Sequence, residues 1–153
     1  MLKRAHRLLI LSCSARKRPD PGYLPAIERY DGPAFRVLRR YLREGPGAEW
    51  LDIYVLSAFY GLIPGTYPII CYEQLMTVER AAELRKEVIS TLRNLISIGY
   101  RNLCLMMSKV YISALGNWEV LIPQGMEVTV IHGTPGSKLT QLKQWLWEEA
   151  PDT

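Results

Sequence analysis

The chain has 153 residues, of which 48% are hydrophobic and 22% are charged. This length suits a single domain over residues 1–153, and the hydrophobic content excludes a disordered chain. No apolar run reaches the roughly 18 residues that a transmembrane helix needs. The three widely spaced cysteines argue against a disulfide framework or a zinc site. We therefore expect a cytoplasmic protein with no membrane contact, no metal and no cofactor.

Positive charge is concentrated in the first third of the chain. Residues 1–50 contain eleven of the 19 Lys and Arg residues but only five of the 15 Asp and Glu residues. A concentrated basic surface suits a protein that binds a polyanion, because each neutralised phosphate releases counterions. The alternative is that these charges only keep the surface soluble.

The first predicted strand, Leu8–Ser12, is a short apolar run that suits a strand buried on both faces. Its end carries small polar side chains and then cations: Ser12, Cys13, Ser14, Arg16, Lys17 and Arg18. Ligands of open α/β sheets bind at the carboxyl ends of the strands. This stretch therefore predicts the floor of an anion or nucleotide pocket. A polar turn that merely leaves a core strand is the alternative.

Residues 19–32 are rich in proline and glycine and predict a long loop, with one helical turn at 26–29. Asp31 is expected to cap the following helix, predicted over Pro33–Glu44. Apolar residues at 35, 38, 41 and 42 form one stripe on this helix that faces the core. Four arginines share its solvent side and, with two cations near the first strand, are expected to bind nucleic acid: Arg36, Arg39, Arg40, Arg43, Lys17 and Arg18.

Three further strands are predicted, and helices separate them. The strands are Ile53–Ser57, Leu103–Met107 and Val128–His132, and the helices span about 77–97, 110–115 and 136–149. We interpret 59–65 as a loop and 68–76 as extended or irregular. Strands that alternate with helices favour parallel pairing and right-handed crossovers. The sequence therefore predicts an α/β fold, a three-layer α/β/α sandwich with a four-stranded, mainly parallel sheet.

In such a sheet the carboxyl ends of all four strands meet at one edge, and each strand here ends in polar residues. We expect a ligand pocket at this edge, where Tyr60 and Tyr72 offer their faces to a planar base. The predicted ligand-binding residues are Ser12, Ser14, Arg16, Ser57, Tyr60, Gly61, Tyr72, Ser108 and Lys109. Tyrosines that only cap the core at the sheet edge are the alternative.

Three side chains at this edge are candidates for catalysis. Glu73 is the best carboxylate for general acid or base chemistry. Cys13 could act as a nucleophile with His132 as its base. Each also has an ordinary structural interpretation: a loop acid, a packed cysteine and a histidine that only makes hydrogen bonds. The dinucleotide-binding glycine motif, the Walker lysine loop and the serine-hydrolase elbow are all missing from the sequence.

Four segments carry a resemblance to known proteins: Ser12–Lys17, Glu28–Phe35, Ser57–Ile63 and Tyr72–Met76. Together they resemble a widespread bacterial, archaeal and phage domain family of unknown function. The last two segments are similar, more weakly, to the peroxide stress protein YaaA family. The Ser-Cys-Ser strand end is similar to the uracil-DNA-glycosylase-like domain of archaeosine-forming tRNA enzymes. Relatives often carry Lys in place of Phe59 and Asp in place of Glu73, and the glycosylase water-activating motif is absent.

The resemblance implies a four-stranded parallel α/β/α sandwich of the uracil-DNA-glycosylase type that handles nucleic acid or nucleobases. Two functions follow as hypotheses. The first is a nucleobase or nucleotide pocket that serves DNA or tRNA modification or repair. The second is a non-catalytic, nucleic-acid-binding stress-response protein of the YaaA type. Under both hypotheses the expected partner is nucleic acid or a nucleotide. The sequence leaves enzymatic activity and oligomeric state open.

Overall fold

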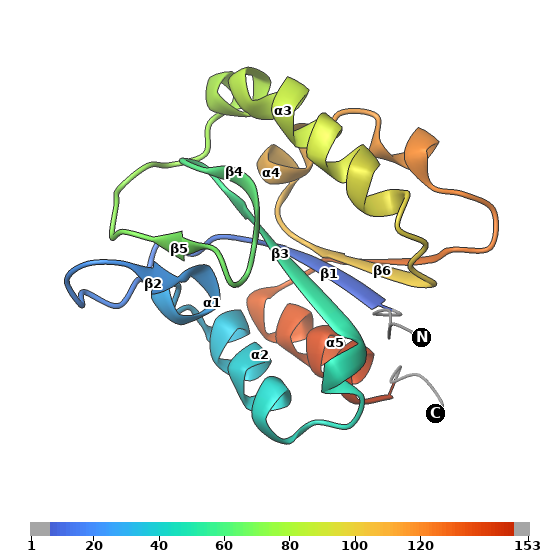
Figure 1. The fold of residues 1–153 in the computed structure, drawn as a ribbon, viewed down its shortest axis with the longest axis horizontal. Helices are drawn as coiled ribbons and strands as arrows, with labels where there is room; N and C mark the ends of the chain where they lie inside the picture. Colours follow the sequence, from blue (N-terminus) through green and yellow to red (C-terminus); the bar gives the residue numbers. More distant parts are fainter. Residues whose placement is uncertain (1–6, 149–153) are drawn as a thin grey trace.

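The computed structural model describes residues 7–148, which build a five-stranded sheet with helices on both faces (Figure 1). In spatial order the strands are β4 (Gly61–Pro64), β3 (Leu51–Ser57), β1 (Arg7–Ser12), β6 (Asn102–Met106) and β7 (Glu127–Ile131). The last four run parallel to one another. Each matches a predicted strand to within two residues at either end.

The fifth strand corrects the prediction of a four-stranded sheet. Residues that we interpreted as a loop form β4, which pairs antiparallel with β3 and makes the sheet mixed. The chain reverses tightly after Ser57, and the φ angle of Gly61 is +82°, a backbone conformation that favours glycine. A second antiparallel pair joins β2 (Leu24–Pro25) to β5 (Pro68–Ile69). Strands this short have no periodic pattern that a sequence could reveal.

Side chains of the sheet alternate between two hydrophobic cores. The helices are α1 (Ala26–Arg29), α2 (Pro33–Glu44), α3 (Val78–Ile96), α4 (Lys109–Ser113) and α5 (Pro135–Glu148), with 3₁₀ turns η1 (Ala48–Trp50) and η2 (Trp118–Leu121). Leu9 and Leu11 face the layer of α1, α2 and α5, whereas Leu8 and Ile10 face α3 and α4 (Figure 1). The predicted helix end at Glu149 lies outside the described residues. Within residues 7–148, no helix has both the length and the apolar character that a membrane crossing requires.

The starts of the helices follow from local side-chain chemistry. Thr77 caps α3, because its hydroxyl accepts a hydrogen bond from the backbone N–H three residues later at 3.0 Å. The predicted Asp31 cap of α2 is wrong. Gly32 is the N-cap residue, and the Asp31 carboxylate instead pairs with Arg36 and Arg39. Asp31 therefore joins the loop to the side of the helix rather than to its end.

A buried arginine organises the loop before α2. Arg29 is 0% exposed, and within residues 7–148 it makes no ion pair with an acid. Its guanidinium donates instead to four backbone carbonyl oxygens, those of Arg18 (2.7 Å), Asp20 (2.8 Å), Gly22 (2.6 Å) and Ile69 (3.4 Å). The first three carbonyls belong to the loop and the fourth to β5. One side chain thus ties the loop after β1 to the small β2–β5 sheet.

Candidate functional site

The carboxyl ends of the four parallel strands lie level with one another. In the register of the sheet, Ser12 pairs with Leu56 and Leu11 pairs with Met106, which in turn pairs with Ile131. The residues that follow these strands therefore start from one edge of the sheet. We name this region the carboxyl edge and define it as residues 12–14, 57–60, 107–109 and 132.

Ser57 fixes the turn that leaves β3. It is 0% exposed, and its Oγ accepts hydrogen bonds from the backbone N–H groups of Phe59 (3.1 Å) and Tyr60 (3.0 Å). The guanidinium of Arg80 in α3 donates to the carbonyl oxygens of Ala58 (2.6 Å) and Phe59 (2.9 Å). Donors and acceptors of the turn are thus satisfied from two sides, which makes the turn a rigid support for the rings that it carries.

Tyrosine hydroxyls form a hydrogen-bonded network on this support. The Tyr72 hydroxyl lies 2.5 Å from the Tyr30 hydroxyl and 2.8 Å from Ser57 Oγ. Tyr60 contributes its hydroxyl as acceptor for the Ile70 N–H at 3.4 Å. Burial raises the pKa of Tyr30 and Tyr72 well above the ordinary value of 10.0. These phenols therefore stay neutral at any physiological pH and act as hydrogen-bond partners rather than as bases.

The end of β1 contacts α4 on one side and the start of α2 on the other. Cys13 Sγ lies 3.2 Å from the hydroxyl of Tyr111 in α4, whose pKa is likewise raised by burial. Ser14 Oγ donates to the Arg16 carbonyl at 2.6 Å and accepts from the N–H of Gly32 at 3.2 Å. A Cβ added at position 32 would lie 3.0 Å from the Ser14 Cβ, so glycine permits this close approach.

Aromatic rings form an exposed surface beside the hydroxyl network. The Phe59 ring is 46% exposed and stacks on the Tyr72 ring, with centroids 5.2 Å apart and an angle of 27° between the planes. Tyr60 contacts both rings edge-on. Lys17 Nζ lies 4.6 Å from the centre of the Tyr72 ring, within the range of a cation–π contact.

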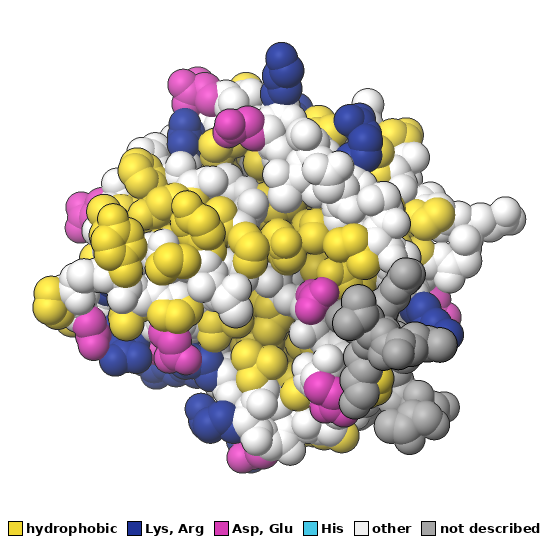
Figure 2. Space-filling model, in the orientation of Figure 1, with side chains coloured by type: hydrophobic (Ala, Val, Ile, Leu, Met, Phe, Trp, Pro, Cys, Tyr) yellow, Lys and Arg dark blue, Asp and Glu magenta, His cyan; other side chains and the backbone are white. Residues whose placement is uncertain are grey.

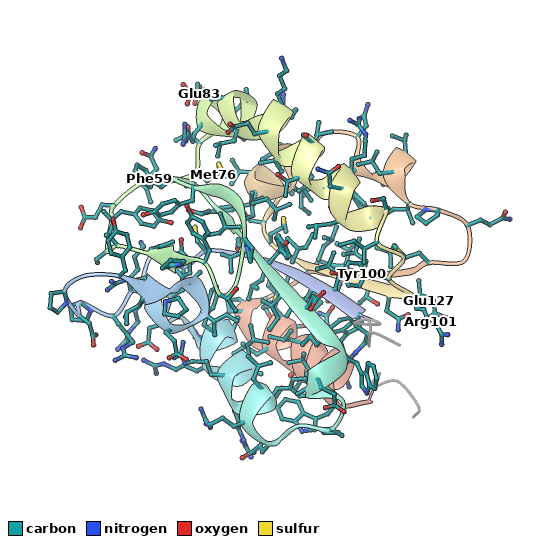
Figure 3. The ribbon with its side chains drawn as sticks, in the orientation of Figure 1. Phe59, Met76, Glu83, Tyr100, Arg101 and Glu127 are labelled. Atoms are coloured by element: carbon teal, nitrogen blue, oxygen red, sulfur yellow. The ribbon has the colours of Figure 1, made fainter. Side chains whose placement is uncertain are left out.

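Further apolar residues extend this surface over β4, β5 and the segment before α3. The exposed ones are Tyr67, Ile70, Leu75 and Val78. Figure 2 shows hydrophobic side chains gathered on this side of the molecule, and Figure 3 labels Phe59 and Met76 there. Figure 3 also places Tyr100 and Glu127 at the opposite end of the sheet.

The three candidates for catalysis are not brought together. Glu73 is exposed and makes no hydrogen bond or ion pair within residues 7–148. His132 follows β7, and β6 lies between that strand and β1, which places His132 about 10 Å from Cys13 at the ordinary spacing of strands. The hydrogen bond of the Cys13 thiol goes to Tyr111 instead. The geometry therefore does not support Cys13 and His132 as a nucleophile–base pair.

The predicted cations near β1 and β6 occupy different environments. Arg16, Lys109 and the neighbouring Ser108 are exposed. Arg18 is engaged in ion pairs with Asp20 at 2.9 Å and Glu28 at 3.6 Å. Arg16, Lys109 and Lys17 therefore remain as the cations that a ligand at the carboxyl edge would meet.

On α2, one of the four predicted arginines departs from the solvent side. Arg36, Arg40 and Arg43 are exposed, but the Arg39 side chain is 16% exposed and turns toward the loop. Its guanidinium donates to the carbonyl oxygens of residues 27 and 30, at 2.8 Å each, and to the Asp31 carboxylate at 2.6 Å. Arg39 therefore holds the loop against α2, and its predicted contact with nucleic acid is unavailable in this arrangement.

Four residues of the candidate site were not predicted as site residues from the sequence: Phe59, Tyr30, Tyr111 and Arg80. Tyr30, Tyr111 and Arg80 all contact the carboxyl edge from segments outside it. Tyr30 and Tyr111 stand next to the predicted starts of helices, which in a parallel α/β fold lie at the same edge as the strand ends. That position is the signal that identifies them. Arg80 has no such signal, because an arginine in the first turn of a helix is ordinarily an exposed surface residue.

A comparison with the models of known protein families identifies the family of this chain. The model of a family of unknown function, DUF6884, matches residues 8–146. The chain belongs to this family. The matched range runs from β1 to α5, so the whole carboxyl edge of this DUF6884 protein falls within it. No curated protein matches the chain.

Among solved structures, the DUF6884 chain is similar to the crystal structure of AF0587, a protein of unknown function. The TM-score is 0.56 and the sequence identity is 16%, and the match covers 99% of this chain and 47% of that one. The chain therefore spans about half the length of that protein. A likeness at this level of identity concerns the fold, and the function has to be argued from the site.

Proposed function

We propose that the carboxyl edge of this DUF6884 protein binds a nucleobase or nucleotide, and that the protein acts in the cytoplasm in DNA or tRNA modification or repair. The observation that carries the proposal is the half-exposed Phe59 ring stacked on Tyr72, with the Lys17 ammonium against the same tyrosine. Nucleobases stack on aromatic faces whatever their sequence. The motif resemblance to YaaA and to uracil-DNA-glycosylase-like domains supports the same class of ligand.

Polar groups beside the rings suit the other parts of a nucleotide. The side chains of Ser12 and Ser108 make no hydrogen bond within residues 7–148, so both hydroxyls are free to bind the polar edge of a base. Arg16 and Lys109 are exposed at the same edge and carry the charge that a phosphate needs. Stacking surface, hydroxyls and cations thus occur within one region.

The proposal is tested by titrating the ¹⁵N-labelled protein with the ribonucleoside 5′-monophosphates and following amide chemical shifts. We expect shifts at residues 12–14 and 57–60, and a loss of affinity of about fivefold or more in Phe59→Ala, because stacking on one ring is removed. Val120→Ala is the matched control, since Val120 is also an exposed apolar residue, at 81%, but lies in η2. Shifts that are absent at millimolar nucleotide, or that cluster around Tyr100, would contradict the proposal.

Non-catalytic binding of the YaaA type is the second candidate, and one observation favours it. The candidate catalytic side chains do not converge, and the phenols at the edge are neutral. Release of free base from a uracil-containing oligonucleotide, abolished by Glu73→Gln, would support the enzymatic function. Nucleotide binding without such release would support the second candidate.

A further inference from the structure

We infer that the groove between α2 and α5 is a second binding site, which takes the phosphate backbone of single-stranded nucleic acid. The groove has a volume of about 560 Å³. Its lining comes from one face of each helix: Arg36, Val37 and Arg40 from α2, and Thr140, Lys143, Gln144 and Trp147 from α5. This surface lies apart from the Phe59 stack and goes beyond the function proposed for the carboxyl edge.

The chemistry of the lining favours an anionic ligand with planar groups. Three of the seven lining residues are cations, and none is an acid. Lys143 makes no ion pair within the described part of the chain, residues 7–148. Trp147 is half-buried and packs edge-on against Tyr41, with ring centroids 5.0 Å apart. An indole held in place beside three cations suits a chain that alternates phosphates and bases.

Nearby acids leave the cations available. The Arg36 and Arg40 side chains pair with Asp31 and Glu44, but they are 52% and 67% exposed. Exposed ion pairs contribute little free energy, so a phosphate can take over these guanidinium groups at small cost. Asp31 keeps its second partner, Arg39, when this happens.

The geometry of the groove selects a single strand. α2 and α5 pack directly against each other, and the space between the side chains of two packed helices is far narrower than a duplex. Both helices also begin at the carboxyl edge, because α2 starts next to Ser14 and α5 starts soon after His132 (Figure 1). A strand in the groove can therefore continue toward the edge where a base is proposed to bind.

The test measures fluorescence anisotropy of fluorescein-labelled dT12 between 50 and 200 mM KCl. The groove variant is Arg36→Gln/Arg40→Gln/Lys143→Gln. The control variant, Lys86→Gln/Arg93→Gln/Arg101→Gln, removes the same charge from exposed positions elsewhere on the molecule. Circular dichroism establishes that both variants are folded. The single variant Lys143→Gln serves as a milder probe of the same groove.

We expect the groove variant to lose about tenfold or more in affinity for dT12, while the control variant loses much less. Three phosphate contacts on a single strand correspond to a salt slope of about −2, so the magnitude of the slope should fall by about 2 in the groove variant and by about 0.7 in Lys143→Gln. Equal affinities and equal salt slopes in the groove and control variants would overturn the inference. So would a dT12·dA12 duplex that binds more tightly than dT12. Mononucleotide binding at Phe59 is measured separately, so the failure of one site is distinguishable from that of the other.

Discussion

Replacing Arg29 with methionine is expected to destabilise the protein strongly, although no acid pairs with it in the described chain. Three of its four hydrogen bonds to carbonyl oxygens are 2.8 Å or shorter. A hydrogen bond that involves a charged group contributes about 1.5–3 kcal/mol. Methionine avoids the cost of burying a charge, and the carbonyls near the surface regain water, which offsets part of the loss. We therefore expect the free energy of unfolding to fall by about 3 kcal/mol.

The assay is equilibrium unfolding in urea, with the slope of free energy against urea compared between variants to establish that the same transition is measured. Arg43→Met is the matched control, because Arg43 is an exposed arginine on α2. It is expected to change the unfolding free energy by no more than about 0.5 kcal/mol. An Arg29→Met variant as stable as this control would refute the reasoning.

Arg29→Lys tests whether the loop is held by the positive charge of Arg29 or by the hydrogen-bond geometry of its guanidinium. Lysine keeps the positive charge but carries one ammonium group, which cannot reach four carbonyls that a planar guanidinium spans. We expect a loss of stability similar to that of methionine. In hydrogen exchange, the amides of Arg18 and Asp31 should lose protection first, because they bond to the carbonyls of Arg29 and Arg16 within this loop. Full stability in Arg29→Lys would show that charge alone holds the loop.

Two further predictions concern the hydroxyl network and the acid end of the pH range. Tyr72→Phe removes a hydroxyl that is hydrogen-bonded to Tyr30 and Ser57, and it should lower the unfolding free energy by about 1–2 kcal/mol. The control is Tyr67→Phe, which should have no effect because the Tyr67 hydroxyl makes no hydrogen bond within residues 7–148. Equal losses of stability in the two variants would contradict the network. Hydrogen bonds from Arg36 and Arg39 lower the pKa of Asp31 from 3.8 to about 2, so its stabilising contribution is complete above pH 4 and is lost as pH falls from about 4 to about 2. Urea midpoints at several pH values should therefore fall more steeply over this window in the wild type than in Asp31→Asn, and parallel curves would count against the pairing.

Much of the fold could be predicted because its signals are local and repeated. β1 is a short apolar run, β7 alternates polar with apolar residues, and α2 shows its buried stripe at Phe35, Leu38 and Tyr41. β4 was missed because its four residues, Gly61–Pro64, give no alternation, and its glycine and its proline are typical of a loop. Its antiparallel pairing depends on the Ser57 turn, which is held by Arg80 from a distant helix. No local pattern encodes such a contact.

The grouping of the candidate residues at one edge of the sheet was predictable, but their individual contacts were not. Parallel strands must end at one edge, so the region followed from the fold class. The roles of Arg29 and Arg39 could not be predicted from the fold class. Arg29 and Arg39 count as surface charges in any composition, yet Arg29 donates to carbonyls of the loop after β1, and Arg39 donates to carbonyls in α1 and just after it. Burial of a guanidinium depends on carbonyl groups that converge only after the chain has folded, and these carry no sequence signature.

The protonation states at the carboxyl edge determine how binding and chemistry can be separated there. Buried phenols of Tyr30 and Tyr72 can share protons in hydrogen bonds but cannot accept one, because their pKa values lie well above 10.0. A proton taken from a bound ligand would therefore need another acceptor, and the candidate is the Glu73 carboxylate, which follows Tyr72 in the chain and is exposed. If this edge performs chemistry, Glu73→Gln should abolish turnover and leave nucleotide affinity unchanged, whereas Phe59→Ala should weaken both. If the edge only recognises its ligand, Glu73→Gln should have no consequence, because the stacked rings, hydroxyls and cations that bind the ligand remain in place.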